Sequence, residues 1–421
     1  MTDLALLLKE EKSLILAALV AIACIFVEHS LLGAGHIVSL FAAAVLIAVI
    51  VLASTRVAHH AEILAHKVGD PYGTMILTLS AVAVEVMILA IMLGSSSSPT
   101  LVRDTIYSAV MLDINGILGL AALLGGLRHG EQPYNDNSGK TYGVMILTAM
   151  GISMIVPEFV PDDRWHYYSG FTIVAMVALY ALFLKMQVGP HSYFFSYSYT
   201  KPRQTSRGAQ PVGAVTNAAA VPLSVSSPLA AINAAPHSVD TAVRASGDQP
   251  GVTGGEVAHT VQDSAADSDD TSAAVSIGVI LVGVVVIGFL AEFMAAFLDS
   301  GLEGTAAPPA LMAVVVALIS AAPEILTALR AALRNRMQNV INIAMGASLS
   351  TVILTVPVME AIALYTGQPF IMAMTPVQTV MVVITLVVAA INLNDGETNA
   401  IEGMTHFVLF ATFIMLTVLG L

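Results

Sequence analysis

The sequence predicts an all-α polytopic membrane protein with about eleven transmembrane helices, arranged as one extra N-terminal helix and two inverted five-helix repeats. Of its 421 residues, 57% are hydrophobic and only 11% are charged, whereas soluble proteins average about 25% charged residues. Its apolar runs are about 20 residues long, enough to cross roughly 30 Å of hydrocarbon as helices. Two of these runs, one in each half of the chain, carry a glutamate.

Apolar helices are expected on both sides of a polar central segment, each long enough to span a bilayer. Those before it are Ser13–Val27, His36–Thr55, Tyr72–Leu93, Asp104–Leu127, Thr141–Val156 and Tyr167–Met186. Those after it are Ala273–Leu298, Ala310–Leu333, Val340–Tyr365, Phe370–Ile391 and Ala400–Leu421. We therefore expect the extra helix within residues 1–35, the first repeat within 36–189, a linker at 190–272 and the second repeat within 273–421.

The central segment, residues 190–272, is rich in Ala, Ser, Pro, Gly, Asp and Thr and has few large apolar residues after Tyr199. A segment of this composition cannot bury enough apolar surface to offset the entropy lost on ordering. We expect a flexible cytoplasmic linker with a basic first part and an acidic last part.

The basic residues predict the orientation of the chain. If the N-terminus is cytoplasmic, nearly all Lys and Arg residues fall on the cytoplasmic side, and only Arg103 and Arg164 fall outside. Cytoplasmic loops of membrane proteins carry such an excess of basic residues. Met1–Lys12 is polar and charged, unlike a cleavable signal peptide. We therefore expect a multi-pass protein of the cell inner membrane, with a cytoplasmic N-terminus and an external C-terminus.

Composition also excludes several function classes. Cys24 is the only cysteine, so an internal disulfide or a thiolate metal cluster cannot form. The net charge of −13 leaves no broad basic surface for nucleic acid. The sequence has no Gly-rich phosphate-binding loop, so we expect no coupling to ATP and no cofactor. The expected partners are the lipid bilayer and small ions, and a homo-oligomer is compatible with the sequence.

The two halves contain matched segments, which predicts an internal repeat. Ala61–Ala65 is similar to Ala291–Ala295, and Glu85 corresponds to Glu324. Arg103–Leu120 aligns with Arg336–Ile353, which puts Asn115 opposite Ser348. Because each half has an odd number of helices, the halves must cross the membrane in opposite directions. Inverted repeats with a polar site between them are a transporter architecture.

Glu85 and Glu324 are the first candidate site residues, because an acidic side chain at the centre of a membrane helix costs about 2.5–3.5 kcal/mol on insertion. Pro323 precedes Glu324 and lacks an N–H, which leaves the carbonyl of Ile319 without its helical partner. Broken helices beside carboxylates form cation sites in transporters. Two carboxylates suit a hard cation such as Ca²⁺. The pair can hold the cation or protons, but not both, and this exclusion is the physical basis of antiport.

Other polar residues near the two glutamates are candidates for supporting roles. Ser80, Ser320, Asn115, Ser348 and Asp113 could supply further cation ligands, although close helix packing alone also favours small and hydroxyl residues. Glu62, Glu292 and Asp299 could act as relay or accessory acids between solvent and the site.

Two alternatives to antiport remain open at this point. His59, Glu62 and His66 share a helical face, and together with His60 they could form an intramembrane metal-dependent hydrolase. Their spacing is not that of a His-Glu-x-x-His motif, and a solvated, pH-responsive face fits them as well. A passive channel is the other alternative.

Three stretches carry a resemblance to a known family. AEILAHKVGDPYGTMILTLSAVAVEVMIL resembles the first α-repeat of the cation/proton exchanger branch of the Ca²⁺/cation antiporter superfamily. APPALMAVVVALISAAPEILTALRAALRNRMQNVINIAMGASLSTVILTVP resembles the second repeat, and NLNDGETNAIEG resembles the signature before the final helix. The similarity is greatest to the bacterial calcium (sodium, potassium)/proton antiporters and covers the chain outside the linker.

The resemblance implies a ten-helix inverted-repeat core with an extra first helix. It also implies that Glu85 and Glu324 bind the cation and exchange it for protons. Many family members have Gly-Asn shortly before each glutamate, whereas this chain has Ala81-Val82 and Ser320-Ala321. The loss of both amide ligands puts high Ca²⁺ affinity in question and leaves room for Na⁺ or K⁺.

The resulting functional hypothesis is a secondary active transporter that exchanges cytoplasmic Ca²⁺, and Na⁺ or K⁺, for protons by alternating access. A Na⁺/K⁺/proton antiporter with little Ca²⁺ activity is the alternative, and the metal-dependent hydrolase is a more remote one.

Overall fold

A computed structural model describes residues 11–68, 72–95, 98–188, 272–305, 308, 310–368 and 370–421. Apart from Ser272, the predicted linker at 190–272 lies outside these residues, and so does residue 189. The domain boundaries expected there stay predictions.

Helices make up nearly all of the described chain. In the first half they are α2 (Lys12–Leu32), α3 (His36–Val68), α4 (Tyr72–Ser95), α5 (Leu101–Met111), α6 (Gly119–His129), α7 (Asp136–Met150) and α8 (Trp165–Val188). In the second half they are α9 (Ala273–Leu302), α10 (Ala310–Ser320), α11 (Ala322–Leu333), α12 (Met337–Ser350), α13 (Val356–Thr366), α14 (Pro376–Asn392) and α15 (Ala400–Val418). Wider π-helical turns at Leu112–Leu118 and Thr351–Thr355 join α5 to α6 and α12 to α13.

The helices have the length and composition of membrane spans. Among the described residues, eight apolar stretches are long enough to cross a bilayer: Lys12–Leu32, His36–Ala65, Leu101–His129, Asp136–Phe159, Trp165–Val188, Ala273–Leu302, Met337–Thr366 and Ala400–Val418. The pair α10 and α11 passes the same test but is bent by 57°, and Thr78–Gly94 and Pro376–Asn392 are shorter apolar helices. The chain is therefore a multi-pass helical membrane protein.

Helix α3 is longer than the sequence predicted. The expected end at Thr55 was wrong, because the helix continues through the polar segment to Val68. Val57, Ala61 and Leu64 keep a buried apolar stripe along this extension, at the spacing of one helical face. The extension brings Glu62 alongside the second half of the chain, since α3 packs along α9.

The expected single helix Ala310–Leu333 is two helices. Helix α10 ends at Ser320, and α11 begins at Ala322 with Pro323 in its first turn. The break follows from the missing N–H of Pro323, which interrupts the ladder of helical hydrogen bonds. Ala321 lies between the two helices and still donates its N–H to the Ala317 carbonyl at 3.0 Å.

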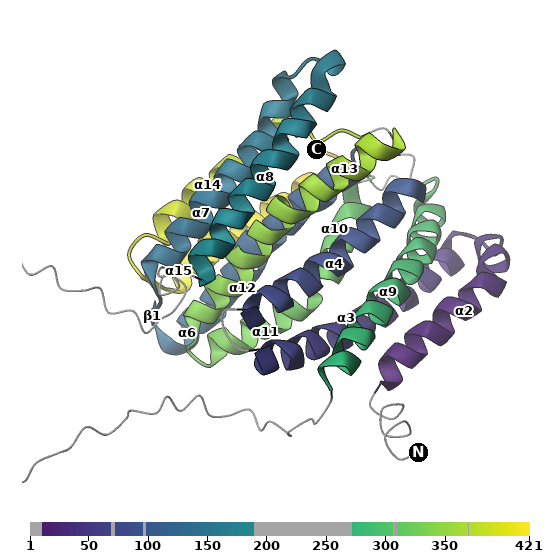
Figure 1. The fold of residues 1–421 in the computed structure, drawn as a ribbon, viewed down its shortest axis with the longest axis horizontal. Coiled ribbons are helices and arrows are strands. Elements are labelled where there is room, and N and C mark those ends of the chain that lie inside the picture. The colour runs from purple at the N-terminus through teal and green to yellow at the C-terminus, as the bar shows by residue number, and fades with distance from the viewer. Residues whose placement is uncertain are drawn as a thin grey trace, which may run out of the picture. The chain divides into compact units, whose positions relative to one another are not determined.

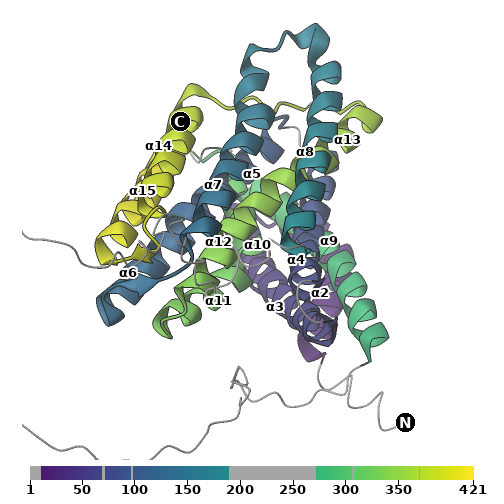
Figure 2. The ribbon, with the colours of Figure 1, turned by 60° about the vertical axis from the view of Figure 1, so that its left-hand side comes forward.

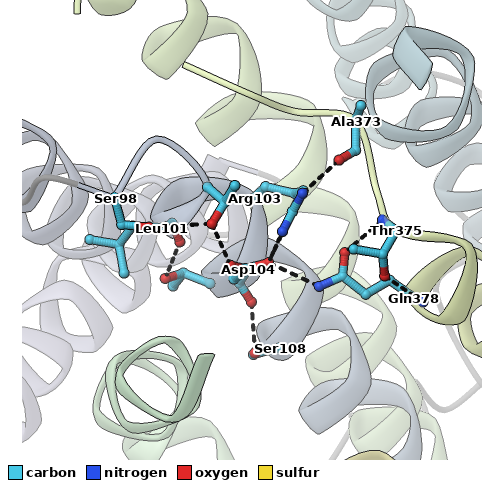
Figure 3. Close-up of polar contacts among 10 residues, drawn as sticks. Ser98, Leu101, Arg103, Asp104, Ser108, Ala373, Thr375 and Gln378 are labelled. Carbon is cyan, nitrogen blue, oxygen red and sulfur yellow. Dashed lines mark hydrogen bonds and ion pairs between the residues drawn. The ribbon is translucent and has the colours of Figure 1, made fainter. Parts of the chain in front are cut away.

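The expected start of a helix at Phe370 was also wrong, because α14 begins at Pro376. Thr375 forms a capping box with Gln378, which fixes the helix start. The segment before it is held in a non-helical path by a buried ion pair from α5 (Figure 3). Arg103 Nη1 donates to the Ala373 carbonyl at 2.8 Å, and Asp104 Oδ1 accepts from Arg103 Nη2 at 2.8 Å and from Gln378 Nε2 at 2.9 Å.

Helices from one half of the chain pack against helices from the other half (Figures 1 and 2). Helix α3 packs along α9, α5 along α10, α7 along α12, α8 along α13 and α6 along α15. The contact between α6 and α15 is especially close: a methyl group at Gly403 would lie 2.1 Å from the backbone nitrogen of Leu123. Small residues permit such backbone approach in membrane helices.

A short antiparallel ribbon joins the turn between α6 and α7 to the turn between α14 and α15. Its strands are β1 (Gln132–Pro133) and β2 (Glu397–Thr398), with Gln132 opposite Thr398. The ribbon fixes one turn of the first half to one turn of the second half.

Candidate cation-binding site

A cavity of about 290 Å³ lies among α3, α4, the end of α5, the α10–α11 break and α12. The helices contribute several acidic, hydroxyl and amide side chains to its wall: Ser54, Glu62, Thr78, Ser80, Glu85, Asp113, Ser320, Glu324, Thr327, Asn342, Ser350 and Thr351. No Lys, Arg or His is among the described residues that line it. The acidic side chains of the cavity wall therefore have no basic side chain in the wall to neutralise them.

Glu85 is buried on α4 and faces the π-helical turn between α12 and α13. Thr351 Oγ1 donates to Glu85 Oε2 at 2.9 Å, and Thr355 Oγ1 donates to the same oxygen at 3.4 Å. The other carboxylate oxygen, Oε1, is buried and has no hydrogen-bond partner among the described residues. One oxygen of Glu85 is thus fixed by protein and the other is available to a ligand.

Glu324 reaches the same cavity from the second half of the chain. It lies in the first turn of α11, directly after the 57° break. Its Oε2 atom is buried and has no hydrogen-bond partner among the described residues. The N-terminal end of a helix stabilises negative charge, so the break gives a carboxylate a favourable position inside an apolar protein.

Asp113 supplies a third carboxyl group to this wall. It lies in the π-helical turn after α5, is 2% exposed, and accepts from Ser348 Oγ at 3.1 Å. It lines the same cavity as Glu324 and Glu85. In the described part of the chain, no group of three or more His, Cys, Asp or Glu side chains is arranged to hold a metal ion by itself. An ion in the cavity would need hydroxyl, amide, carbonyl or water oxygens in addition.

The remaining candidate residues divide into two groups. Ser80, Ser320 and Glu62 line the cavity, although the two serine hydroxyls donate to the carbonyls of Ile76 and Ala317 in their own helices. Glu292 and Asp299 are exposed on α9 and do not line the cavity.

Asn115 does not line the cavity either. Ser348, with which it aligns in the second half, differs because its hydroxyl group donates to Asp113 in the cavity wall. The Asn115 amide nitrogen donates to Thr385 Oγ1 at 2.7 Å, and its oxygen lies 3.0 Å from His406 Nδ1. Its side chain therefore lies among α14, α15 and the π-helical turn. The wide turn changes which residues of the segment face the cavity, and an alignment that assumes regular helices misses this change.

Sequence reasoning missed the two threonines that bind Glu85. Thr351 and Thr355 are four residues apart and share one helical face. The sequence does contain a signal for them: two hydroxyl residues at this spacing in an apolar segment of the second half of the chain, whereas Glu85 lies in the first half. Glu360 was also missed: it is buried on α13 and bonds Thr172 of α8 at 3.1 Å, away from the cavity.

His60, one of the residues of the hydrolase alternative, is bonded away from Glu62. His60 Nε2 bonds Glu11 Oε1 at 2.8 Å and His60 Nδ1 lies 3.3 Å from Ser276 Oγ, whereas Glu62 lines the cavity. The side chain of His66 lies outside the described residues. Burial would raise the pKa of Glu11, but hydrogen bonds from Arg56 and His60 outweigh burial and lower the pKa below its ordinary value of 4.5.

The packing of helices from the two halves against each other, the broken helix and the acidic cavity define a class of protein, a helical membrane transporter of cations. Comparison with known proteins agrees. The chain belongs to the sodium/calcium exchanger protein family, which it matches over residues 38–189 and 275–419.

Two relatives and one solved structure are informative. The chain is 27% identical over 370 residues to the putative ionic transporter y4hA of Sinorhizobium fredii, a match that covers 85% of this chain and 83% of the relative. It is 30% identical over 362 residues to the sodium-potassium/proton antiporter ChaA of Escherichia coli, covering 85% and 84%. The structure of native YfkE shares the fold, with a TM-score of 0.62 at 16% identity, covering 93% of this chain and 99% of that chain.

These findings confirm the resemblance to the Ca²⁺/cation antiporter superfamily. The protein is an ion antiporter rather than an enzyme, which removes the hydrolase alternative.

Proposed function

We propose that the protein exchanges cytoplasmic Ca²⁺, and Na⁺ or K⁺, for protons, with Glu85 and Glu324 as the groups that bind the cation and the protons in turn. One observation carries the proposal: two glutamates from different halves enter one cavity, each with a buried carboxylate oxygen that has no protein partner among the described residues. Unpaired charge is costly to bury, so these carboxyl groups must be neutralised by a cation or by protons.

Exclusion between the two ligands follows from the same geometry. A cation needs both carboxyl groups ionised, together with hydroxyl and amide oxygens from the wall. Protons on the carboxyl groups remove the negative charge that attracts the cation. One cavity therefore serves both ions at different stages of the cycle, which couples their movements.

Selectivity for Na⁺ or K⁺ is the second candidate, and the residues before each glutamate favour it. Ala81-Val82 and Ser320-Ala321 provide no side-chain amide at the positions where the family resemblance implies asparagine. Asn342 and the hydroxyl groups of Ser350 and Thr351 remain as neutral oxygen donors in the wall. ChaA, at 30% identity, is a sodium-potassium/proton antiporter.

We further propose eleven membrane spans in two inverted five-helix repeats, with α2 as the extra helix and the N-terminus in the cytoplasm. The eight long apolar stretches, the bent pair α10–α11 and the two shorter apolar helices fit this count. In this orientation the ends of α3 and α11, at Val68 and Leu333, lie at the cytoplasmic face. The lining residues of α3, α11 and α12 lie on the cytoplasmic side of the middle of their spans, whereas Ala109 and Asp113 lie in the outer half of the span Leu101–His129. In the proposed orientation the cavity therefore extends from the middle of the membrane toward the cytoplasm.

The experiment is cation-dependent proton flux in everted inner-membrane vesicles, with Ca²⁺, Na⁺ and K⁺ added in turn. We expect Glu85→Gln and Glu324→Gln to abolish exchange, because glutamine cannot cycle between a charged and a protonated form. Glu360→Gln is the matched control, since Glu360, like Glu85, is buried in an apolar helix but lies outside the cavity. Exchange that persists in both Glu85→Gln and Glu324→Gln would refute the proposal.

A further inference from the structure

We propose that Gln132, in the turn between α6 and α7, is a positioning residue that sets the direction of α11 and so the place of the Glu324 carboxyl group. This inference rests on the proposed role of Glu324 as a cation and proton ligand. It concerns a residue that neither lines the cavity nor touches Glu324.

Helix α11 cannot take its direction from α10. The two helices meet at a 57° break, and Pro323 interrupts the hydrogen bonds that would make them one rod. The direction of α11 must therefore come from contacts along its sides and at its far end. Glu324 lies in its first turn, so any tilt about the far end displaces the carboxyl group.

The far end of α11 is held by side chains from the end of α6 and from the turn after it. Gln132 Nε2 donates to the Ala332 carbonyl and to Asn335 Oδ1, both at 3.0 Å. His129 Nε2 lies 3.0 Å from the Leu333 carbonyl oxygen, to which it must be the donor. The Ala332 carbonyl also accepts from the backbone N–H of Asn335 at 3.0 Å, so Gln132 adds a second donor, from another helix pair, at the end of α11.

The Gln132 amide is itself held in one orientation. Its side chain is fully buried, and the Ala332 carbonyl can only accept, so the amide nitrogen must point toward α11. Its backbone is fixed by the ribbon pairing with Thr398, on the turn between α14 and α15. Both the side chain and the backbone of Gln132 are therefore held in one position, unlike those of a mobile surface residue.

Gly125 provides the space in which this amide lies. A methyl group at position 125 would be 1.9 Å from Gln132 Oε1 and 2.8 Å from its Cδ, so the methyl group and the amide cannot both occupy this space. Replacing Gly125 by alanine must therefore displace the amide from the position in which it donates to α11, while Gln132 itself is retained. The hydrogen bond from Gln132 to the end of α11 can thus be removed by a substitution at either Gln132 or Gly125.

The length of α11 converts a small tilt into a relevant displacement. At 1.5 Å per residue, the Glu324 position lies about 12 Å along the axis from Ala332, so a tilt of about 5° moves it by about 1 Å. Binding groups must be held to within about 0.5 Å of their productive geometry. Loss of the Gln132 contact is therefore expected to weaken cation binding without removing any ligand.

The test measures cation-dependent proton flux in vesicles that contain equal amounts of wild type, Gln132→Leu, Gly125→Ala or the double variant. The two quantities compared are the maximal flux, Vmax, and the cation concentration that gives half of it, K0.5. We expect each single variant to raise K0.5 about fivefold or more. The double variant should match the larger single effect, because both substitutions remove one contact. The matched control is Gln378→Leu, since Gln378 is also a buried glutamine that donates to another helix, but to Asp104 and not to α11.

Unchanged K0.5 in either single variant, additive effects in the double variant, or an equal rise in Gln378→Leu would overturn the positioning role. If Gln132→Leu does not accumulate in the membrane, Gly125→Ala carries the test by itself. Glu324→Gln is included in the same series. Exchange that survives Glu324→Gln refutes the proposed function, whereas loss of exchange there with normal K0.5 in Gly125→Ala refutes only the inference about Gln132.

Discussion

Replacing Thr351 by valine removes one hydroxyl group from the site and keeps the shape of the side chain. Thr351 Oγ1 donates to Glu85 Oε2 at 2.9 Å, and Thr355 Oγ1 is farther from the same oxygen, at 3.4 Å. Thr351 lines the cavity, and Thr355 is fully buried beside it. The substitution therefore tests how much protein hydrogen bonding contributes to the ionised form of Glu85.

The magnitude follows from the charge on the acceptor. A hydrogen bond to a charged group contributes about 1.5–3 kcal/mol, against about 0.5–1.5 kcal/mol for a neutral one. The cation-bound state needs Glu85 ionised, so Thr351→Val should cost that state about 1 kcal/mol more than the protonated state. This difference raises the K0.5 for the cation by about five- to tenfold.

The assay is cation-dependent proton flux in everted vesicles at constant pH, with K0.5 measured over a range of cation concentrations. Thr355→Val should have a smaller effect, because its bond is longer. Thr417→Val is the control, since Thr417 is a buried threonine that bonds the Phe413 carbonyl of its own helix. The reasoning fails if Thr351→Val leaves K0.5 unchanged, or if Thr355→Val has the larger effect.

Two further predictions concern stability. Asp104→Asn breaks a buried ion pair and leaves Arg103 without its counter-charge, so it should destabilise the protein by about 3–5 kcal/mol; a thermal midpoint in detergent equal to that of the wild type would contradict this. Glu11 has a pKa below 4.5 in the folded protein, so its ionised form stabilises the fold at neutral pH, and this contribution is lost as the pH falls through the lowered pKa. Glu11→Gln should therefore lower the thermal midpoint at pH 7 and have progressively less effect below about pH 4.5; an equal loss at every pH would refute the assignment.

Much of the architecture could be predicted because hydrophobic length and periodic composition report membrane helices directly. The acidic residues Glu85 and Glu324 stand out in their apolar runs, and Pro323 marks the break that the structure has at Ala321. These features are local, so a single sequence reveals them.

The parts that could not be predicted depend on contacts between distant segments. Thr351 becomes a partner of Glu85 only when α4 lies beside the turn after α12. Asn115 faces His406 and Thr385 because the segment Leu112–Leu118 is wound as a π-helical turn. The late start of α14 at Pro376 depends on Arg103, a residue of the other half of the chain. Hydrophobicity along the sequence carries no information on these pairings.

The central claim, that a cation and protons compete for the carboxyl groups of one cavity, is tested most directly on purified protein in detergent. The measurement is proton release into a weakly buffered solution when Ca²⁺, Na⁺ or K⁺ is added. The account predicts proton release by the wild type and by Glu360→Gln, and none by the double variant Glu85→Gln/Glu324→Gln. Cation binding by the wild type without any proton release, or equal release by the double variant, would contradict it.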